Sequence, residues 1–245
     1  MRLFFAAAAS LALTACSAGS EEPSGTDEFN ARVHRYIVEN PEVIEQALIA
    51  LQQRARAREQ AQMEAVIAAV AAQEDMISQD PRDPVFGPAD ARVTIVEFFD
   101  YRCPYCSVAN DWLASVAAAH PEDVRIVFKE LPMLGAASQE AARAALAVWK
   151  LNPERYLNVH NALMSADGRL TSARIDEIVE AEGISAEAMR ETMQSDAVSA
   201  HLSDISELAD MAGIRGTPFF IINGEVIAGA NVERLQASLA AALRD

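Results

Sequence analysis

Cysteine is scarce in this chain of 245 residues, and the scarcity excludes a fold built on crosslinks. The three cysteines are Cys16, Cys103 and Cys106, whereas small disulfide-rich domains carry about two to four disulfides. A structural zinc ion takes four ligands, and none of the four histidines stands at a zinc-finger spacing from Cys103 and Cys106. We therefore expect neither a structural disulfide framework nor a metal site.

Basic residues are also few, since 20 Lys and Arg stand against 36 Asp and Glu and the net charge is -16. Nucleic-acid binding depends on Lys and Arg side chains that neutralise phosphates, so the sequence predicts no nucleic-acid partner. The apolar run from Leu3 to Ala15 is short as well. It cannot span a bilayer, which takes a helix of about 20 residues.

That N-terminal run fits the apolar region of a secretory signal sequence. It ends at Leu13-Thr14-Ala15-Cys16, which resembles the lipobox of bacterial lipoproteins, where the cysteine becomes the lipidated N-terminus. The alternative is an ordinary cleaved signal with an incidental cysteine. We interpret residues 1–16 as signal sequence and lipobox with lipidation at Cys16, and residues 17–27 as a Ser/Gly/Glu-rich tether. This predicts an exported, periplasmic protein anchored as a lipoprotein, in a compartment where thiols can be oxidised.

Residues 28–80 are predicted to form a helical segment, because Gly and Pro are absent between Pro41 and Ser78. One helix of that length would be a rod of about 57 Å. Its apolar seam recurs at helical spacing and consists of Ile44, Leu48, Leu51 and Ala55. An exposed seam of this kind needs a partner helix, so we interpret the segment as an oligomerisation stalk. The alternative is that it folds back on the rest of the chain.

The stretch "QDPRDPVFGPADA" is rich in Pro and Gly and predicts a domain boundary, with a second domain over residues 84–245. "RVTIVEFFD" is apolar on both faces, as in a buried central strand, and "DVRIVFKELPML" predicts a second strand. The sequence from about residue 135 to residue 213 predicts a block of helices. "TPFFIING" and "EVIAGA" predict a hairpin with an Asn-Gly turn, and an amphipathic helix closes the chain. The fold class is therefore α/β with a helical insertion.

The motif Cys103-Pro104-Tyr105-Cys106 follows the first strand directly and opens a helix. Free N–H groups and the helix dipole at such a position stabilise a thiolate, which lowers the pKa of a cysteine there. This makes Cys103 the candidate nucleophile, and Cys106, one turn inside the helix, the residue that resolves a mixed disulfide. Pro104 lacks an N–H and suits the first helical position. Pro104 and Tyr105 are expected to tune the redox potential.

Glu97 is the polar exception in its predicted strand, where the residues of the same parity are apolar. A buried carboxylate is costly unless it has a partner or a task. We interpret Glu97 as a candidate proton acceptor for Cys106, with Lys129 on the next strand as its partner. The alternative is a solvent-exposed glutamate at a sheet edge.

Thr217-Pro218 stands directly before the predicted hairpin. An X-Pro bond at the beginning of a strand can be cis, and such a bond would expose the Thr217 backbone beside the cysteines. That backbone could pair with an extended substrate as a short β-bridge.

The segments "VEFFDYRCPYC", "VFKELPMLG" and "GTPFFIING" together resemble the DsbA-type branch of the thioredoxin superfamily, over roughly Pro84 to Asp245. The resemblance implies a thioredoxin-like fold with an inserted helical domain. It implies that Cys103 and Cys106 form the redox-active disulfide, that Glu97 is the acidic residue near them, and that Pro218 is the cis-proline. The motif has Tyr where DsbA has His, and Thr precedes the cis-proline as in isomerases and reductases. We therefore expect a weaker oxidant than DsbA.

The segment "VHRYIVENPEVIEQAL" is similar to the N-terminal extension of ScsC-like bacterial proteins, some of which form trimers and isomerise disulfides. The combined resemblance implies a thiol-disulfide oxidoreductase without a cofactor that forms or isomerises disulfides in exported client proteins. It also implies a membrane redox partner and a homotrimer through residues 28–80. Oxidase and isomerase stay open. A copper-binding or copper-tolerance module that uses the same cysteines is the alternative, because paired thiolates favour Cu(I).

Overall fold

The computed structural model describes residues 25–166 and 170–244, and the chain divides into two compact units, 1–58 and 59–245. The expected signal sequence with Cys16, and all but the end of the expected tether, lie outside the described residues. Among the described residues, no helix combines the length and apolar character needed to cross a membrane.

The first unit contains α1 (Gly25–Glu39) and the beginning of α2 (Glu42–Ala72). Between the two helices, the side chain of Asn40 donates to the Tyr36 carbonyl oxygen at 2.8 Å, and Pro41 precedes a helix whose first turn carries Glu42 and Glu45. No residue from 25 to 58 is buried. Large apolar side chains of this unit are exposed, including Phe29, Tyr36, Ile44, Leu48 and Leu51. The described residues of the first unit therefore form no core within a single chain.

The predicted rod is not continuous to Ser78, because α2 ends at Ala72 and a separate short helix, α3 (Glu74–Ser78), follows. From residue 59 onward the rod belongs to the second unit. Val70 of α2 and Ile77 of α3 are buried in one apolar cluster with Ile205 and Leu208. The C-terminal half of the predicted stalk thus packs on the second domain, as the alternative interpretation has it. The two units divide between residues 58 and 59, and not near residue 80.

The second unit is built on one five-stranded sheet with strand order β1-β3-β2-β4-β5. β2 runs parallel to β3, and the other neighbours are antiparallel. Six of the seven residues of β2 are buried, which agrees with the apolar run that predicted a central strand. The strands are β1 (Val85–Phe86), β2 (Val93–Phe99), β3 (Val124–Glu130), β4 (Phe219–Ile222) and β5 (Glu225–Ala228).

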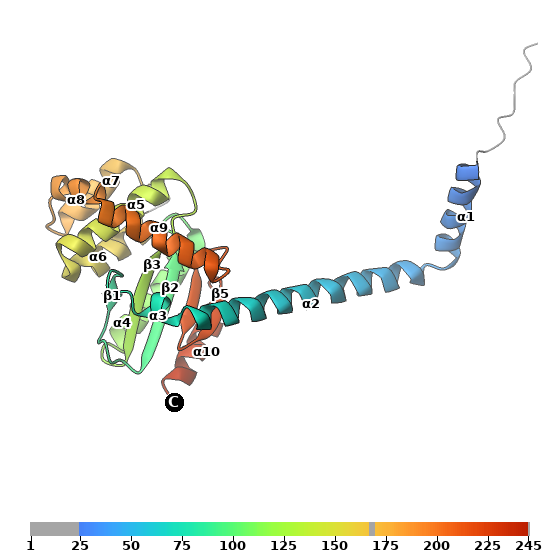
Figure 1. Ribbon diagram of the computed structural model, residues 1–245, viewed down its shortest axis with the longest axis horizontal. Helices are drawn as coiled ribbons and strands as arrows, with labels where there is room; N and C mark the ends of the chain where they lie inside the picture. Colours follow the sequence, from blue (N-terminus) through green and yellow to red (C-terminus); the bar gives the residue numbers. More distant parts are fainter. Residues whose placement is uncertain (1–24, 167–169, 245) are drawn as a thin grey trace, which may run out of the picture. The chain divides into compact units, whose positions relative to one another are not determined.

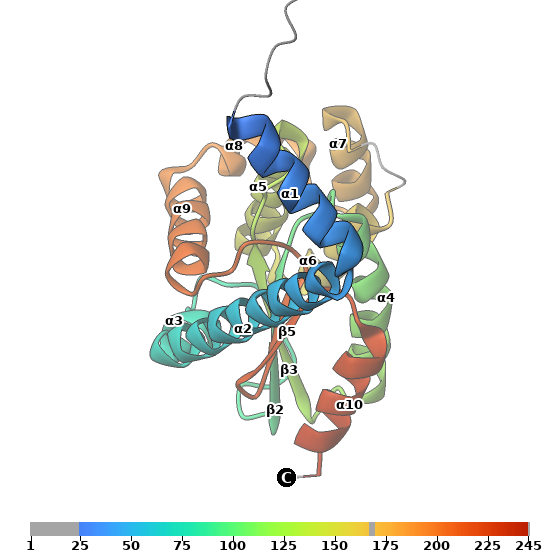
Figure 2. The same ribbon diagram turned by 90° about the vertical axis from the view of Figure 1, so that its right-hand side faces the viewer.

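Helices cover both faces of this sheet (Figures 1 and 2). Alternate residues of β2 serve the two faces: Ile95 packs into a cluster with α4, α10 and α5 to α8, whereas Phe98 packs with α2, α3 and α9. Helices α5 to α9 follow β3 and precede β4, as the helical insertion was predicted to do. The helices are α4 (Pro104–Ala119), α5 (Ala136–Leu151), α6 (Pro153–Met164), α7 (Ser172–Ala181), α8 (Ala186–Met193), α9 (Asp196–Met211) and α10 (Val232–Ala242).

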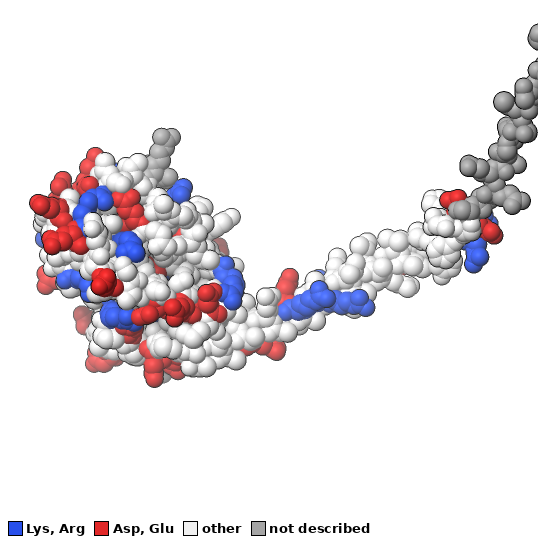
Figure 3. Space-filling view, turned by 45° about the horizontal axis from the view of Figure 1, so that its top comes forward, with Lys and Arg blue, Asp and Glu red and all other residues white. Residues whose placement is uncertain are grey.

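Acidic and basic side chains lie side by side over the face of this unit that Figure 3 shows. Ion pairs of this unit include Arg190 with Glu140 at 3.0 Å and with Asp176 at 2.8 Å. Ion pairs that are open to solvent contribute little to stability, and the core clusters on the two faces of the sheet hold the unit together.

Candidate active site

The turn between β2 and α4 carries the cysteine motif and is fixed by Asp100. The Asp100 carboxylate accepts the backbone N–H of Arg102 at 2.8 Å and those of Met133 and Leu134 at 2.6 and 2.9 Å. The Asp100 carbonyl oxygen accepts the Cys103 N–H at 3.0 Å. Sequence reasoning missed this residue, although an aspartate at the end of a strand is a common turn former. Asp100 thus ties the motif to the segment after β3.

Cys103 is the N-cap of α4, and Pro104 occupies the first turn as predicted. The Thr217–Pro218 peptide bond is cis, as the sequence predicted. The Cys103 Sγ lies 3.3 Å from the Thr217 carbonyl oxygen, within reach of a weak S–H donor. The structure therefore brings Cys103, Thr217 and Pro218 together from two segments that are more than a hundred residues apart.

The two cysteines are free thiols that differ in exposure. Cys103 is 7% exposed, Cys106 is completely buried, and the intervening Tyr105 is 67% exposed. Burial raises the pKa of Cys106, and the nearby negative charge of Glu97 raises it further. In the reduced protein Cys106 is therefore a protonated thiol, while Cys103 lies nearer to solvent at the helix N-terminus.

Glu97 is completely buried on β2, where Phe128 of β3 and Phe220 of β4 stand beside it in register. The alternative of an exposed edge glutamate is therefore wrong. Among the described residues, neither carboxylate oxygen has a hydrogen-bond partner. Burial raises the pKa of Glu97 well above its usual value, and negative charge on Cys103 raises it further. Glu97 is thus a buried carboxyl group that is electrostatically coupled to both cysteines.

Two models of known protein families match the chain. Residues 94–240 match the model of the DSBA-like thioredoxin domain, which covers more than half of the sequence. The chain belongs to the DSBA-like thioredoxin family. Residues 26–58 also match the copper resistance protein ScsC N-terminal domain. DSBA-like domains belong to thiol-disulfide oxidoreductases. The expected thioredoxin-like fold, with an inserted helical block and N-terminal helices, is confirmed.

The relatives include solved structures and curated proteins. A Proteus mirabilis ScsC variant with a linker deletion is 28% identical with a TM-score of 0.68, over 93% of this chain and 99% of that one. Disulfide bond formation protein D of Bacillus subtilis is 28% identical over 62% of this chain and 74% of its own length. Na(+)/H(+) antiporter NhaA 1 of Salinispora arenicola is 30% identical over 68% of this chain. The chain spans 26% of that antiporter's length.

Lys129 of the DSBA-like domain is not the partner of Glu97, so that prediction was wrong. In the parallel pairing of β2 and β3, Lys129 stands beside Phe98, one residue out of step with Glu97. Its side chain therefore projects from the opposite face of the sheet. There its Nζ lies 2.5 Å from Asp83 Oδ2 and donates to the Met76 carbonyl oxygen at 2.7 Å.

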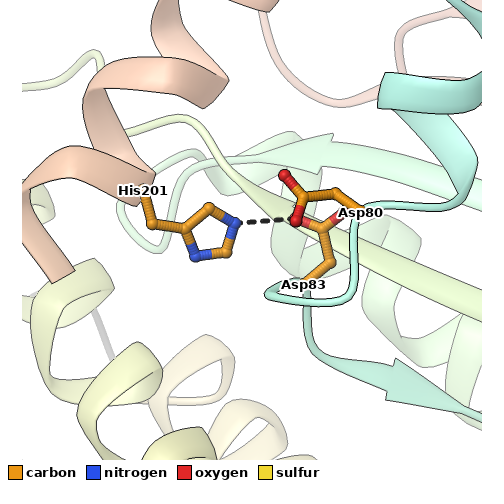
Figure 4. Close-up of side chains that lie close together, drawn as sticks. All are labelled: Asp80, Asp83 and His201. Carbon is orange, nitrogen blue, oxygen red and sulfur yellow. Dashed lines mark hydrogen bonds and ion pairs between the residues drawn. The ribbon is translucent and has the colours of Figure 1, made fainter. Parts of the chain in front are cut away.

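Asp83 also binds His201 of α9, whose Nε2 lies 2.9 Å from Asp83 Oδ1 (Figure 4). We call Asp83, Lys129 and His201 the Asp83 clasp. Asp80 lies close enough to Asp83 and His201 for the three to surround a metal ion. However, Lys129 already pairs with Asp83, and Arg82 pairs with Asp80 at 2.6 Å. The cationic side chains take the place of an ion, and the clasp joins the segment before β1 to β3 and α9.

A second buried carboxyl group, Glu130, lies at the end of β3. Its Oε1 accepts the hydroxyl of Tyr156 at 2.7 Å, and its Oε2 has no hydrogen-bond partner among the described residues. Burial raises the pKa of Glu130 to about 8, against the opposing effect of the Tyr156 hydrogen bond. The folded protein therefore holds Glu130 protonated at a pH where the unfolded chain has released the proton.

This shift predicts that stability falls as pH rises. Below about pH 4.5 Glu130 is protonated in both states, and its contribution is fully present; between there and about pH 8 only the unfolded state ionises, which favours unfolding. Glu130→Gln removes that dependence and retains an acceptor for Tyr156. We expect the gain of the variant over the parent to rise from about 1 kcal/mol at pH 5 to about 4 kcal/mol at pH 8, measured by urea unfolding.

Glu97→Gln is the matched comparison. The pKa of Glu97 is also raised, so ionisation of Glu97 in the unfolded state makes a separate contribution to the fall of stability with pH. The two substitutions should therefore flatten the pH dependence independently. An unchanged slope in Glu130→Gln would contradict the assignment of Glu130 as a protonated group.

Proposed function

We propose that this protein exchanges thiols and disulfides in exported client proteins, with Cys103 as the attacking and Cys106 as the resolving sulfur. The observation that carries the proposal is the asymmetry of the pair: Cys103 caps a helix beside the Thr217 carbonyl oxygen, and Cys106 is buried one turn further in. The less buried sulfur, which lies at a helix N-terminus, suits attack on a client. A buried sulfur beside it suits only an intramolecular step.

Thiol-disulfide exchange begins at Cys103. The Cys103 thiolate attacks one sulfur of a client disulfide, the client S–S bond breaks, and the other client sulfur leaves as a thiolate that takes a proton from water. In isomerisation the freed client sulfur, as a thiolate, attacks another disulfide of the client. A client thiolate finally attacks the mixed disulfide, which forms a new client S–S bond and releases the Cys103 thiolate with no net redox change. In reduction Cys106 attacks the Cys103 sulfur instead, so that the client leaves with two thiols and the pair becomes a disulfide.

Cys106 must lose its proton to attack, and Glu97 is the acceptor that we assign to it. The Glu97 carboxyl group has no competing hydrogen bond from the described residues. A charge on Glu97 and a charge on Cys106 destabilise each other. Transfer of the Cys106 proton to an ionised Glu97 leaves a single negative charge, on the Cys106 sulfur, so the buried site never holds both charges at once. Pro104, at the helix start, and Tyr105, exposed beside Cys103, are assigned as the residues that tune the potential of the pair.

A groove of about 770 Å³ beside Thr217 supports contact with an extended client segment. Its walls come from α2, the end of α9 and the loop that carries Pro218, all within the second unit. Flexible methionines suit a surface that accepts different sequences. Met63 and Met211 are both exposed there, and the apolar lining also includes Val66, Ala69, Pro218 and Phe219. We assign the backbone of Thr217 as the edge with which the client pairs.

The first unit supports an oligomeric isomerase. Its described residues have no core, its apolar seam of Ile44, Leu48 and Leu51 is exposed, and residues 26–58 match the ScsC N-terminal domain. Burial of this seam against other copies, as a trimer through residues 28–80, would turn several redox sites toward one client. The sequence of residues 1–16 supports export, with lipidation at Cys16. The DSBA-like family supports a membrane redox partner, which in an isomerase would keep the pair reduced. The described residues contain no third cysteine beside the pair, and copper binding is not proposed.

The proposal predicts that charges in the seam separate the copies. Leu48→Glu/Leu51→Glu should lower the mass in solution to that of one chain and abolish refolding of a scrambled disulfide protein, with reduction of a small aromatic disulfide unchanged. Gln53→Glu/Gln60→Glu adds the same charge to the same helix outside the seam and should keep the parent's mass and activity. Light scattering gives the mass, and a single-chain mass for the parent protein would overturn the oligomeric proposal.

A further inference from the structure

A buried histidine of the helical insertion contacts residues that precede and follow the redox motif in the sequence. His160 lies on α6 and is completely buried. Its Nδ1 is 3.1 Å from the hydroxyl of Tyr101, and its Nε2 is 3.0 Å from Asn110 Oδ1. Tyr101 precedes Cys103 in the turn after β2, and Asn110 follows Cys106 on α4. One imidazole ring thus joins the segment that enters the motif to the helix that leaves it.

The directions of these hydrogen bonds follow from the neighbouring amide. Asn110 donates through Nδ2 to Asn161 Oδ1 at 3.1 Å, so its own Oδ1 is the atom turned toward His160. Nε2 of His160 then carries the proton and donates, and Nδ1 accepts from the Tyr101 hydroxyl. Burial lowers the pKa of His160 to about 3, which agrees with a neutral ring that has one donor and one acceptor.

Aromatic packing holds the ring in that orientation. Phe99 meets it edge to face with ring centroids 4.9 Å apart, Phe128 lies at 4.6 Å, and Tyr156 stacks on it at 5.8 Å with an interplanar angle of 26°. Contacts from β2, β3 and α6 thus oppose rotation of the imidazole. The titratable groups that surround Tyr101 here are Glu97, Glu130 and Tyr156.

We propose that His160 is a positioning residue for the redox pair, a role that rests on the proposed thiol-disulfide function. Through Tyr101 and Asn110 it fixes the turn that ends at Cys103 against α4, which keeps the Cys103 sulfur at the helix N-terminus and beside Thr217. The helical insertion contains neither the two cysteines nor the cis-proline. Through His160 it nevertheless sets the geometry on which their chemistry depends.

The test is the pH profile of Cys103 alkylation in the reduced protein, followed by mass spectrometry with iodoacetamide. His160→Phe keeps an aromatic ring in place and removes both hydrogen bonds, and Tyr101→Phe removes one hydroxyl group. Both should shift the profile to higher pH and lower the rate on its acidic side about threefold to tenfold, the range expected when a helix-terminal interaction is weakened. Their double variant should be no worse than His160→Phe, because the two act through one bridge.

His201→Gln is the matched control, since this buried histidine belongs to the Asp83 clasp on the opposite face of the sheet. It should lower the free energy of unfolding and leave the alkylation profile of Cys103 unchanged. If Tyr101→Phe and His160→Phe lower the free energy of unfolding but keep the parent's pH profile of Cys103 alkylation, His160 is only structural and the proposal is overturned. Alkylation requires no client, so this result stands apart from any failure of disulfide exchange.

Discussion

Cys106→Ser is expected to trap the protein on its clients as a mixed disulfide, whereas Cys103→Ser is expected to abolish exchange. We propose Cys103 as the sulfur that a client approaches, because it caps α4 beside Thr217 and keeps some exposure, whereas Cys106 is completely buried. Without Cys103 no covalent intermediate forms, and the exchange rate should fall by about three orders of magnitude or more. Without Cys106 the intermediate forms, but its intramolecular resolution is lost.

The measurement is the rate of reduction of a peptide disulfide, with non-reducing gels and mass spectrometry for the trapped species. Ser107→Ala is the matched control, because it removes a neighbouring hydroxyl group and leaves both sulfurs in place. A trapped client in Cys103→Ser and none in Cys106→Ser would reverse the two roles. Full exchange activity in Cys103→Ser would remove the redox function from this pair altogether.

The elements that carry the cysteine pair and Pro218 could be predicted from the sequence because they depend on short segments. The apolar run of β2, the helix start after Cys103 and the cis bond before Pro218 each follow from local pattern and chain stereochemistry. The face of the sheet to which a side chain points depends instead on the register between strands. One residue of register separates Lys129 from Glu97, and the sequence of either strand alone does not contain that information.

The limits of the second unit were harder to predict for a related reason. The Pro- and Gly-rich stretch before β1 has the composition of a linker, yet Asp83 within it is buried and binds side chains of β3 and α9. His201 is 118 positions further along the chain, so no local window reveals the contact. His160 was missed for the same reason, because its partners Tyr101 and Asn110 lie some 50 to 60 positions before it.

Lys129→Met is expected to destabilise the second unit strongly. The ammonium group of Lys129 and the carboxylate of Asp83 are both buried and lie 2.5 Å apart. Removal of one member of a buried ion pair leaves the other charge without its compensation, which costs about 3–5 kcal/mol. Lys129→Met/Asp83→Leu removes both charges and should recover a large part of that loss, because an apolar pair of similar volume is often tolerated.

Arg82→Met provides the matched comparison within the same segment. Arg82 pairs with Asp80 and Asp204 at 2.6 Å each, but its side chain is 45% exposed, so the expected loss is only about 0–1 kcal/mol. Urea unfolding at constant pH measures all three variants. Equal losses for Lys129→Met and Arg82→Met would show that the Asp83 clasp does not hold β1, β3 and α9 together. A large loss confined to Lys129→Met, reversed in part by Asp83→Leu, would establish the clasp as the attachment of this segment to the catalytic unit.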